Sequence, residues 1–349
     1  MRGPRSVVPR RGRTLVVLAL VGVAVAVAIV VLLLARDGTG SAPASPGSPS
    51  ATMPLTGMPT DEVPRRPAVL VKVSNSPEAR PQTGLDQADL VFEALTEGGT
   101  TRFMAVFHST LPEVVGPVRS ARPVDAQLVA GFDHPGFAYS GARAEVRALL
   151  SAAPAVSLTE GAPGFFRDRG EYASRPVAPH DLFVELAPVL AAVTERGAQP
   201  LRDPGWSFTT TPPPEAHGPA GDVDVALSRS STTSWRYDED QQVYRRSQNS
   251  VPSAVTGTGM IGAANVVVLD TRHDVGPSGY PETDVLGGGA AWIARDGLVF
   301  EARWSKPSPT DPLMLLQADG TTPFPLHPGP TWIHLADDAA LPSGTADPA

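Results

Sequence analysis

The hydrophobic pattern begins with an uninterrupted apolar run near the N-terminus. Residues 14–35, TLVVLALVGVAVAVAIVVLLLA, are 22 positions without a charge or a proline. A helix of this length crosses a hydrocarbon core of ~30 Å at 1.5 Å per residue. Five arginines lie within residues 1–13, which predicts a cytoplasmic N-terminal tail and a body outside the cytoplasm. The alternative is a cleaved signal peptide, whose apolar stretch is usually about 7 to 15 residues.

The pattern beyond this run divides the chain into further segments. Residues 36–54 are small, polar or proline, so we expect a tether that cannot bury a core. The sequence is globular from 55 to 336, and residues 337–349 are predicted to form a flexible tail. Six prolines in 200–221 indicate a linker between two lobes. The first lobe spans residues 55–199 and the second lobe spans 222–336.

The first lobe has the pattern of a mixed α/β unit. Short β-branched and apolar segments at 68–73 and 102–107 predict buried strands. Residues 86–96 fit either a helix that begins at Asp86 or a bend followed by a strand from Leu90. Apolar residues at three- and four-residue spacing favour helices at 145–152 and 180–196.

The second lobe has the alternation and turn signals of an antiparallel sheet. An Asp-Gly pair at 319–320 is typical of a tight hairpin turn. Residues 331–335 are expected to close the sheet. The other predicted strands lie at 222–227, 234–238, 242–245, 265–270, 291–294, 298–304 and 314–317. The fold class predicted for the whole body is therefore α+β, with a mainly antiparallel β second lobe.

Composition narrows the possible functions. The chain has no cysteine, which excludes disulfides, thiol catalysis and lipid attachment through a cysteine. Residues 37–349 hold 22 basic and 36 acidic side chains, a net charge of −14 that disfavours nucleic acid as a partner. No metal-ligand motif is evident, and we interpret His273, His327 and His334 as exposed structural residues. We predict no metal and no cofactor, and membrane contact through residues 14–35.

Polar side chains that follow the strands of the first lobe form the candidate site, because loops at strand ends converge. Arginines there can bind a carboxylate or phosphate through two hydrogen bonds. Arg119 and Arg122 are the expected anion contacts, and His180 either faces the same site or caps the predicted helix. In the alternative interpretation, these arginines pair with Glu93 or Glu97 and only fix the loops. The candidate ligand-binding residues are Asn75, Glu97, Arg102, Arg119, Ser120, Arg122 and His180.

The chain also resembles a known family. The first-lobe segments that carry the resemblance are PLTGMPTDE from 54, RPAVLVKVSNSPEARPQTGLDQADLVFEAL from 66, EGGTTRFMAVF from 97, VGPVRSARP from 115 and APHDLF from 178. The second lobe contributes SWRYDEDQQVYRR, ANVVVLDTRH and HPGPTWIHL. Together they resemble the YerB-like proteins of the DUF3048 family. The resemblance implies an exported, surface-tethered bacterial protein in two family parts, with a largely unassigned biochemical role.

Three functions are compatible with these observations. The leading hypothesis is an envelope protein that binds an anionic or carbohydrate-like ligand, or a partner protein, at the arginine-rich site. The second is a scaffold whose loops are locked by internal ion pairs. The third is an enzyme acting on envelope polymers, in which Glu97 and His180 would exchange protons and Ser120 would be the nucleophile. The sequence favours a binding protein over an enzyme.

Overall fold

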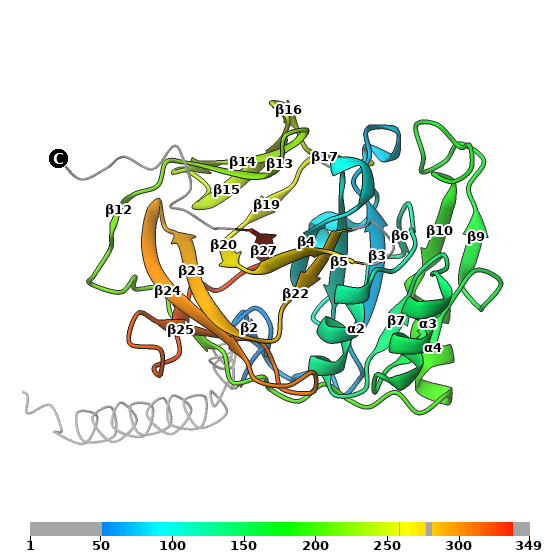
Figure 1. Ribbon diagram of the computed structural model, residues 1–349, viewed down its shortest axis with the longest axis horizontal. Coiled ribbons are helices and arrows are strands. Elements are labelled where there is room, and N and C mark those ends of the chain that lie inside the picture. Colours follow the sequence, from blue (N-terminus) through cyan, green and yellow to red (C-terminus); the bar gives the residue numbers. More distant parts are fainter. Residues whose placement is uncertain (1–50, 258, 277–280, 338–349) are drawn as a thin grey trace, which may run out of the picture. The chain divides into compact units, whose positions relative to one another are not determined.

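The structure is a computed structural model that describes residues 51–257, 259–276 and 281–337 (Figure 1). These residues belong to one compact unit. The predicted cytoplasmic tail at 1–13 and membrane helix at 14–35 lie outside the described residues, as do most of the tether and of the C-terminal tail. Among the helices that are described, none has the length and apolar character needed to cross a membrane.

One mixed sheet of 11 strands runs through both lobes. Its central strand, β27 (Thr331–Ala336), pairs in parallel with β20 (Asn265–Asp270) of the second lobe and with β4 (Leu90–Leu95) of the first. On the first-lobe side the order continues with β5 (Thr101–Phe107), β3 (Val69–Ser74), β7 (Gly136–Ala138) and β8 (Val156–Leu158). On the other side it continues with β23 (Gly287–Arg295), β24 (Leu298–Lys306) and β12 (Gly218–Pro219), and β25 (Met314–Gln317) also pairs with β24.

The position of β27 corrects the expectation that residues 331–335 close the second-lobe sheet. The strand instead lies in the middle of the sheet and joins the two lobes. All six residues of β27 are buried, and such a continuous buried run is typical of an interior parallel strand. The local pattern of TWIHLA therefore fits a central strand, but it does not identify the neighbouring strands.

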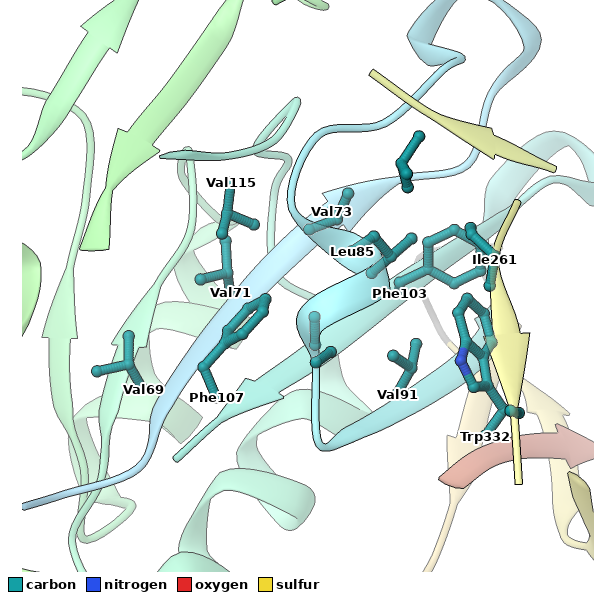
Figure 2. Packing of buried hydrophobic residues seen from close by; sticks show 14 of the residues in the cluster. Val69, Val71, Val73, Leu85, Val91, Phe103, Phe107, Val115, Ile261 and Trp332 are labelled. Carbon is teal, nitrogen blue, oxygen red and sulfur yellow. The ribbon is translucent and has the colours of Figure 1, made fainter. Parts of the chain in front are cut away.

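Residues of the central strands alternate between two apolar layers. Val69, Val71 and Val73 of β3 face one layer together with Phe103 and Trp332, as Figure 2 shows. The opposite layer receives the intervening side chains, including Leu70 from β3. This period of two is the geometry of a strand, and here both faces are buried.

Different elements cover the two faces of the sheet. The first face packs against α4 (Leu186–Glu195) and a small antiparallel sheet of the second lobe. That small sheet consists of β13 (Asp222–Ser228), β14 (Ser231–Asp238), β15 (Val243–Gln248), β16 (Val251–Pro252) and β19 (Gly262–Ala263). The second face packs against α2 (Pro123–Val129) and α3 (Ala144–Ala152).

Short elements complete the described body. The paired strands are β1 (Ala51–Thr52) with β2 (Pro59–Thr60), β6 (Val114–Val115) and β9 (Phe165–Arg167) with β10 (Leu182–Glu185), β11 (Ser207–Phe208) with β26 (Pro325–Leu326), β17 (Ala254–Val255) with β18 (Gly259–Met260), and β21 (Arg272–Val275) with β22 (Pro281–Asp284). The 3₁₀ turns are η1 (Pro77–Ala79), η2 (Leu85–Gln87), η3 (Glu97–Gly99) and η4 (Ala130–Phe132).

The helices differ in how well they were predicted. The helix expected at 145–152 is α3. The helix expected at 180–196 is wrong in its first part, where Leu182–Glu185 form β10 and only Leu186–Glu195 are helical. Three consecutive buried apolar residues begin that segment, so its hydrophobic pattern suits a strand as well as a helix. For residues 86–96, the structure has the bend followed by a strand from Leu90.

Strands dominate the described body, so the α+β prediction holds with more β structure than expected. Every second-lobe strand predicted from alternation corresponds to an observed strand, with ends that differ by a few residues. The loops of the first lobe that carry the candidate site extend from β3, β4 and β5 and from the segment between β6 and α2.

Candidate functional site

Glu97 and Arg102 lie at the turn between β4 and β5. Gly98 and Gly99 in this turn both have φ near +72°, a conformation that glycine adopts without strain. Ser228 of the second lobe donates a hydrogen bond from Oγ to the Gly99 carbonyl at 2.7 Å. The turn that carries Glu97 is therefore fixed from both lobes.

Two arginines bind the Glu97 carboxylate. Arg122 donates from Nε to Oε2 at 2.8 Å and from Nη2 to Oε1, which is a bidentate arrangement. Arg102 Nη2 lies 3.3 Å from Oε1. Burial acts to raise the pKa of Glu97, but the hydrogen bond from Arg122, a backbone hydrogen bond and the two guanidinium charges outweigh it and lower that pKa to about 2. Glu97 is thus ionised at neutral pH.

A buried ion pair positions the loop that carries Arg119 to Arg122. Arg122 is the N-cap of α2, and its backbone N–H donates to Asp125 Oδ2 at 2.6 Å. Asp125 Oδ1 accepts a hydrogen bond of 2.6 Å from Lys72 Nζ on β3, and both side chains are buried. Because Asp125 bonds to both segments, it holds the arginine loop against the central sheet.

A cavity of about 290 Å³ opens beside this loop. Its lining includes Glu97, Ser120 and Arg122 from the first lobe and Glu282 from β22 of the second. Arg143 and Glu145 also line it and pair with each other at 2.7 Å. The structure therefore brings three of the predicted site residues to one cavity whose wall is completed by the second lobe.

Arg119 and His180 lie close together beside this cavity. Arg119 Nη1 is 3.4 Å from His180 Nδ1, and Ser76 Oγ is 3.4 Å from the same nitrogen. Burial and the charge of Arg119 lower the pKa of His180, so the ring is neutral at pH 7 and Nδ1 can accept a hydrogen bond. The possibility that His180 caps a helix is wrong, because His180 precedes β10 and Glu185 is the N-cap of α4.

The arginines carry more charge than their one carboxylate neutralises. Arg102 and Arg122 share Glu97, and Arg119 has no ion pair among the residues that the structure describes. Burial and the neighbouring Arg122 lower the pKa of Arg102 to about 10, which is still well above neutral. Two guanidinium groups therefore share one carboxylate and the third lies beside a neutral histidine, an arrangement that suits an anion.

Comparison with known proteins assigns the chain to a family. Residues 55–199 match the family model described as "Protein of unknown function (DUF3048) N-terminal domain", and residues 223–333 match the DUF3048 C-terminal domain. The chain belongs to the DUF3048 family. This result confirms the resemblance seen in the sequence.

A relative and a solved structure support the assignment to DUF3048. "Putative lipoprotein YerB" of Bacillus subtilis (strain 168) is 31% identical over 291 residues, which cover 82% of this chain and 86% of that protein. The crystal structure of YerB from Bacillus subtilis matches with a TM-score of 0.71 and 30% identity, over 83% of this chain and 97% of that chain. The two proteins share a fold over most of their lengths.

Asn75 lies in a buried polar cluster between the two DUF3048 parts, and it does not line the cavity beside Arg122. Its Nδ2 is within hydrogen-bond distance of Glu93 Oε1 at 3.1 Å, Thr101 Oγ1 at 2.7 Å and Gln248 Oε1 at 2.8 Å. Gln248 belongs to β15 of the second part, so Asn75 links the central sheet to the small sheet above it.

Glu93 is the centre of this buried cluster. Arg246 Nη2 lies 3.1 Å from Oε2, and His334 Nδ1 also lies 3.1 Å from Oε2. Trp235 Nε1 can only donate, so its 2.9 Å contact with His334 Nε2 places the ring proton on Nδ1, facing Glu93. Burial acts to raise the pKa of Glu93, but Arg246 and His334 outweigh it and hold that pKa well below its ordinary value.

The local sequence pattern does not reveal the buried cluster as a unit. A glutamate inside the apolar strand LVFEAL is a signal that could have drawn attention to Glu93, because a carboxylate in a core needs a partner. Arg246 gives no comparable signal, because it follows Arg245 directly in the strand VYRRSQ. Two adjacent arginines are more typical of a solvent-exposed strand than of a core. His334 is fully buried, so our interpretation of it as an exposed histidine is wrong.

No group of three or more histidines, aspartates and glutamates suited to a metal occurs among the described residues. Ser120 Oγ lies 3.2 Å from Ser140 Oγ, whereas the side-chain partners of His180 are Ser76 and Arg119. The chemistry that this arrangement supports best is the binding of an anion by guanidinium groups.

Proposed function

We propose that this protein acts outside the cytoplasm, anchored in the cell membrane by residues 14–35, and binds an anionic envelope ligand through Arg102, Arg119 and Arg122. The length of the apolar run and the arginines before it support the anchor and its orientation. The relative named as a lipoprotein is consistent with an envelope location. Because this chain has no cysteine, the apolar helix takes the place of a lipid anchor.

The observation that carries the ligand proposal is the unbalanced charge beside a cavity. Glu97 neutralises one of the three guanidinium charges, and Arg119 has a neutral histidine as its neighbour. A phosphate or carboxylate group would accept the free donors of Arg119 and the one N–H that Arg122 has left on Nη2, because Arg122 Nη1 already donates to the Ser120 and Ala121 carbonyls. The cavity lining includes no aromatic residue, which favours recognition of charge over stacking on a sugar ring.

Isothermal titration calorimetry of the full chain in a non-ionic detergent tests the proposal. The probes are inorganic phosphate and glucuronate, which present the two candidate anionic groups. We expect the Arg119→Ala, Arg122→Ala double variant to lose affinity by about tenfold or more, because hydrogen bonds to charged groups contribute roughly 1.5–3 kcal/mol each. Arg236→Ala is the matched control, since Arg236 is exposed on β14 and pairs with Asp222. Equal affinities of wild type and the double variant would refute the proposal.

The scaffold alternative has one observation in its favour, namely that Arg102 and Arg122 already pair with Glu97. In that case the ion pairs only lock the loops to each other. The double variant would then lose thermal stability while neither probe bound the wild-type protein. Calorimetry and a melting curve on the same samples therefore distinguish the two functions.

A further inference from the structure

A second cavity lies next to the segment that contacts His180 through Ser76. Its volume is about 300 Å³, and it is lined by Pro77, Glu78, Arg80, Ser174 and Arg175. The first three residues belong to the segment after β3, and the last two belong to the loop between β9 and β10. None of these residues lines the first cavity, so this is a separate region of the same surface.

Arg80 presents donors in this cavity that the protein leaves unused. Its Nη2 donates to the Asn75 carbonyl at 2.6 Å, but the buried Nε has no hydrogen-bond partner among the described residues. The Nε atom is itself buried, so an anion in the cavity would contact the terminal nitrogens of Arg80 and would offset the unfavourable burial of its charge. Burial and the charge of Arg246 lower the pKa of Arg80, while the charges of Glu93 and Glu78 act to raise it.

The loop that presents Arg175 is held in place by its own hydrogen bonds. Asp168 accepts backbone N–H groups from each of the residues 170–173, at distances between 2.8 and 3.2 Å. Ser174 Oγ donates to the Arg80 carbonyl at 2.9 Å. Arg175 itself is exposed, so its guanidinium is available at the edge of a positioned loop.

A continuous set of residues connects the two cavities. Ser120 lines the first cavity and adjoins Arg119, which contacts His180. His180 in turn contacts Ser76, which adjoins Pro77 in the lining of the second cavity. Arg119 lines neither cavity itself, but this set of neighbours and contacts runs from one cavity to the other through it.

The charge along this path is opposite to that of the body. Four arginines lie on it, and three carboxylates oppose them, while Arg143 and Glu145 neutralise each other. The four arginines are Arg80, Arg119, Arg122 and Arg175, and the carboxylates are Glu78, Glu97 and Glu282; the buried Arg102 adds a further positive charge behind Glu97. Residues 37–349 have a net charge of −14, so a locally positive path on this protein is distinctive.

We infer that this path binds a linear polyanion, a polymer with repeated phosphate or carboxylate groups, which spans both cavities and crosses Arg119. The inference rests on the proposed function and adds that the ligand carries more than one anionic group. Neither cavity lining includes an aromatic side chain on which bases could stack, so the proposal is a non-nucleic-acid polymer.

The test compares a single anion with a polymer of the same anion. Full-length protein in a non-ionic detergent is titrated by calorimetry with inorganic phosphate, long-chain polyphosphate and an oligothymidylate. We expect polyphosphate to bind at least about tenfold more tightly than phosphate, because a second contact adds to the first. Arg175→Ala should lower polyphosphate affinity by about tenfold and should change binding of phosphate at Arg119 and Arg122 much less, since it removes charge-assisted bonds from the second cavity alone. Arg236→Ala again serves as the control.

The outcomes separate this inference from the function on which it rests. In one outcome, phosphate binds and its binding requires Arg119 and Arg122, but polyphosphate binds no more tightly than phosphate, or Arg175→Ala leaves polyphosphate affinity unchanged. This outcome overturns the polymer inference and leaves the anion site standing. If neither phosphate nor polyphosphate binds, both are overturned. Oligothymidylate binding as tight as polyphosphate would overturn the choice of a non-nucleic-acid polymer. Because Arg175 is exposed, its substitution leaves the core intact.

Discussion

Replacing Arg246 with methionine is expected to destabilise the fold by leaving the charge of Glu93 buried and unpaired. The Arg246 and Glu93 side chains are both buried, and Arg246 Nη2 lies 3.2 Å from Glu93 Oε1 and 3.1 Å from Glu93 Oε2. Loss of one partner of a buried ion pair costs about 3–5 kcal/mol. Methionine retains an unbranched apolar stem against Phe103 and Trp332, whose rings lie about 5 Å from the guanidinium carbon.

The free energy of unfolding, measured by urea denaturation followed by circular dichroism, provides the assay. Small domains are stable by about 5–15 kcal/mol, so a loss of 3–5 kcal/mol is readily measured. Arg245→Met is the matched control, because Arg245 is the next residue of β15, is partly exposed and pairs with Asp238 at 3.5 Å. We expect that control to cost less than about 1 kcal/mol.

A second variant keeps the prediction testable if Arg246→Met does not fold at all. The double variant Arg246→Met, Glu93→Gln removes both charges, and neutral replacements of a buried pair cost less than removal of one partner. We expect it to recover part of the lost stability. If Arg246→Met costs no more than Arg245→Met, or if the double variant is no more stable than the single one, the assignment of an uncompensated buried charge is refuted.

Two further predictions concern Glu97. Glu97→Gln removes the carboxylate shared by Arg102 and Arg122, so it should raise the affinity for inorganic phosphate by about tenfold, and calorimetry that shows weaker binding would contradict this. The pKa of Glu97 is about 2 in the folded protein and 4.5 ordinarily, so its contribution to stability is present above pH 4.5 and is lost as the pH falls towards 2. Urea denaturation across this range should show a shallower decline for Glu97→Gln, and an identical decline would refute the prediction.

The sequence predicted the individual strands better than their neighbours. Alternation and turn residues locate strands because these signals are local, which explains the agreement for β20, β23 and β24. The parallel pairing of β27 with β4 is a contact between segments far apart in the chain, and no local pattern specifies it. The segment at 182–185 shows a further limit, since a short apolar run fits a strand or the first turn of a helix.

The candidate site was predictable in its residue types and less so in its grouping. Glu97 follows β4, Arg102 is the second residue of β5 and Arg122 precedes α2, and the structure places both arginines in contact with Glu97. Asn75 also follows a strand, but its side chain points into the cluster around Glu93. The direction of a side chain in a loop depends on the partners that reach it from elsewhere, and here these are Glu93 and Thr101 of the first lobe and Gln248 of the second.

The placement of β27 has a consequence for how the chain reaches its native state. The strand beside β4 is made roughly 240 residues after it, so the first-lobe half of the sheet has an open, apolar edge until residues 331–336 have been synthesised. A chain truncated before Thr331 would keep the edge of β4 exposed and would tend to aggregate. Such late closure also slows folding, because distant segments must meet before their contacts stabilise the sheet.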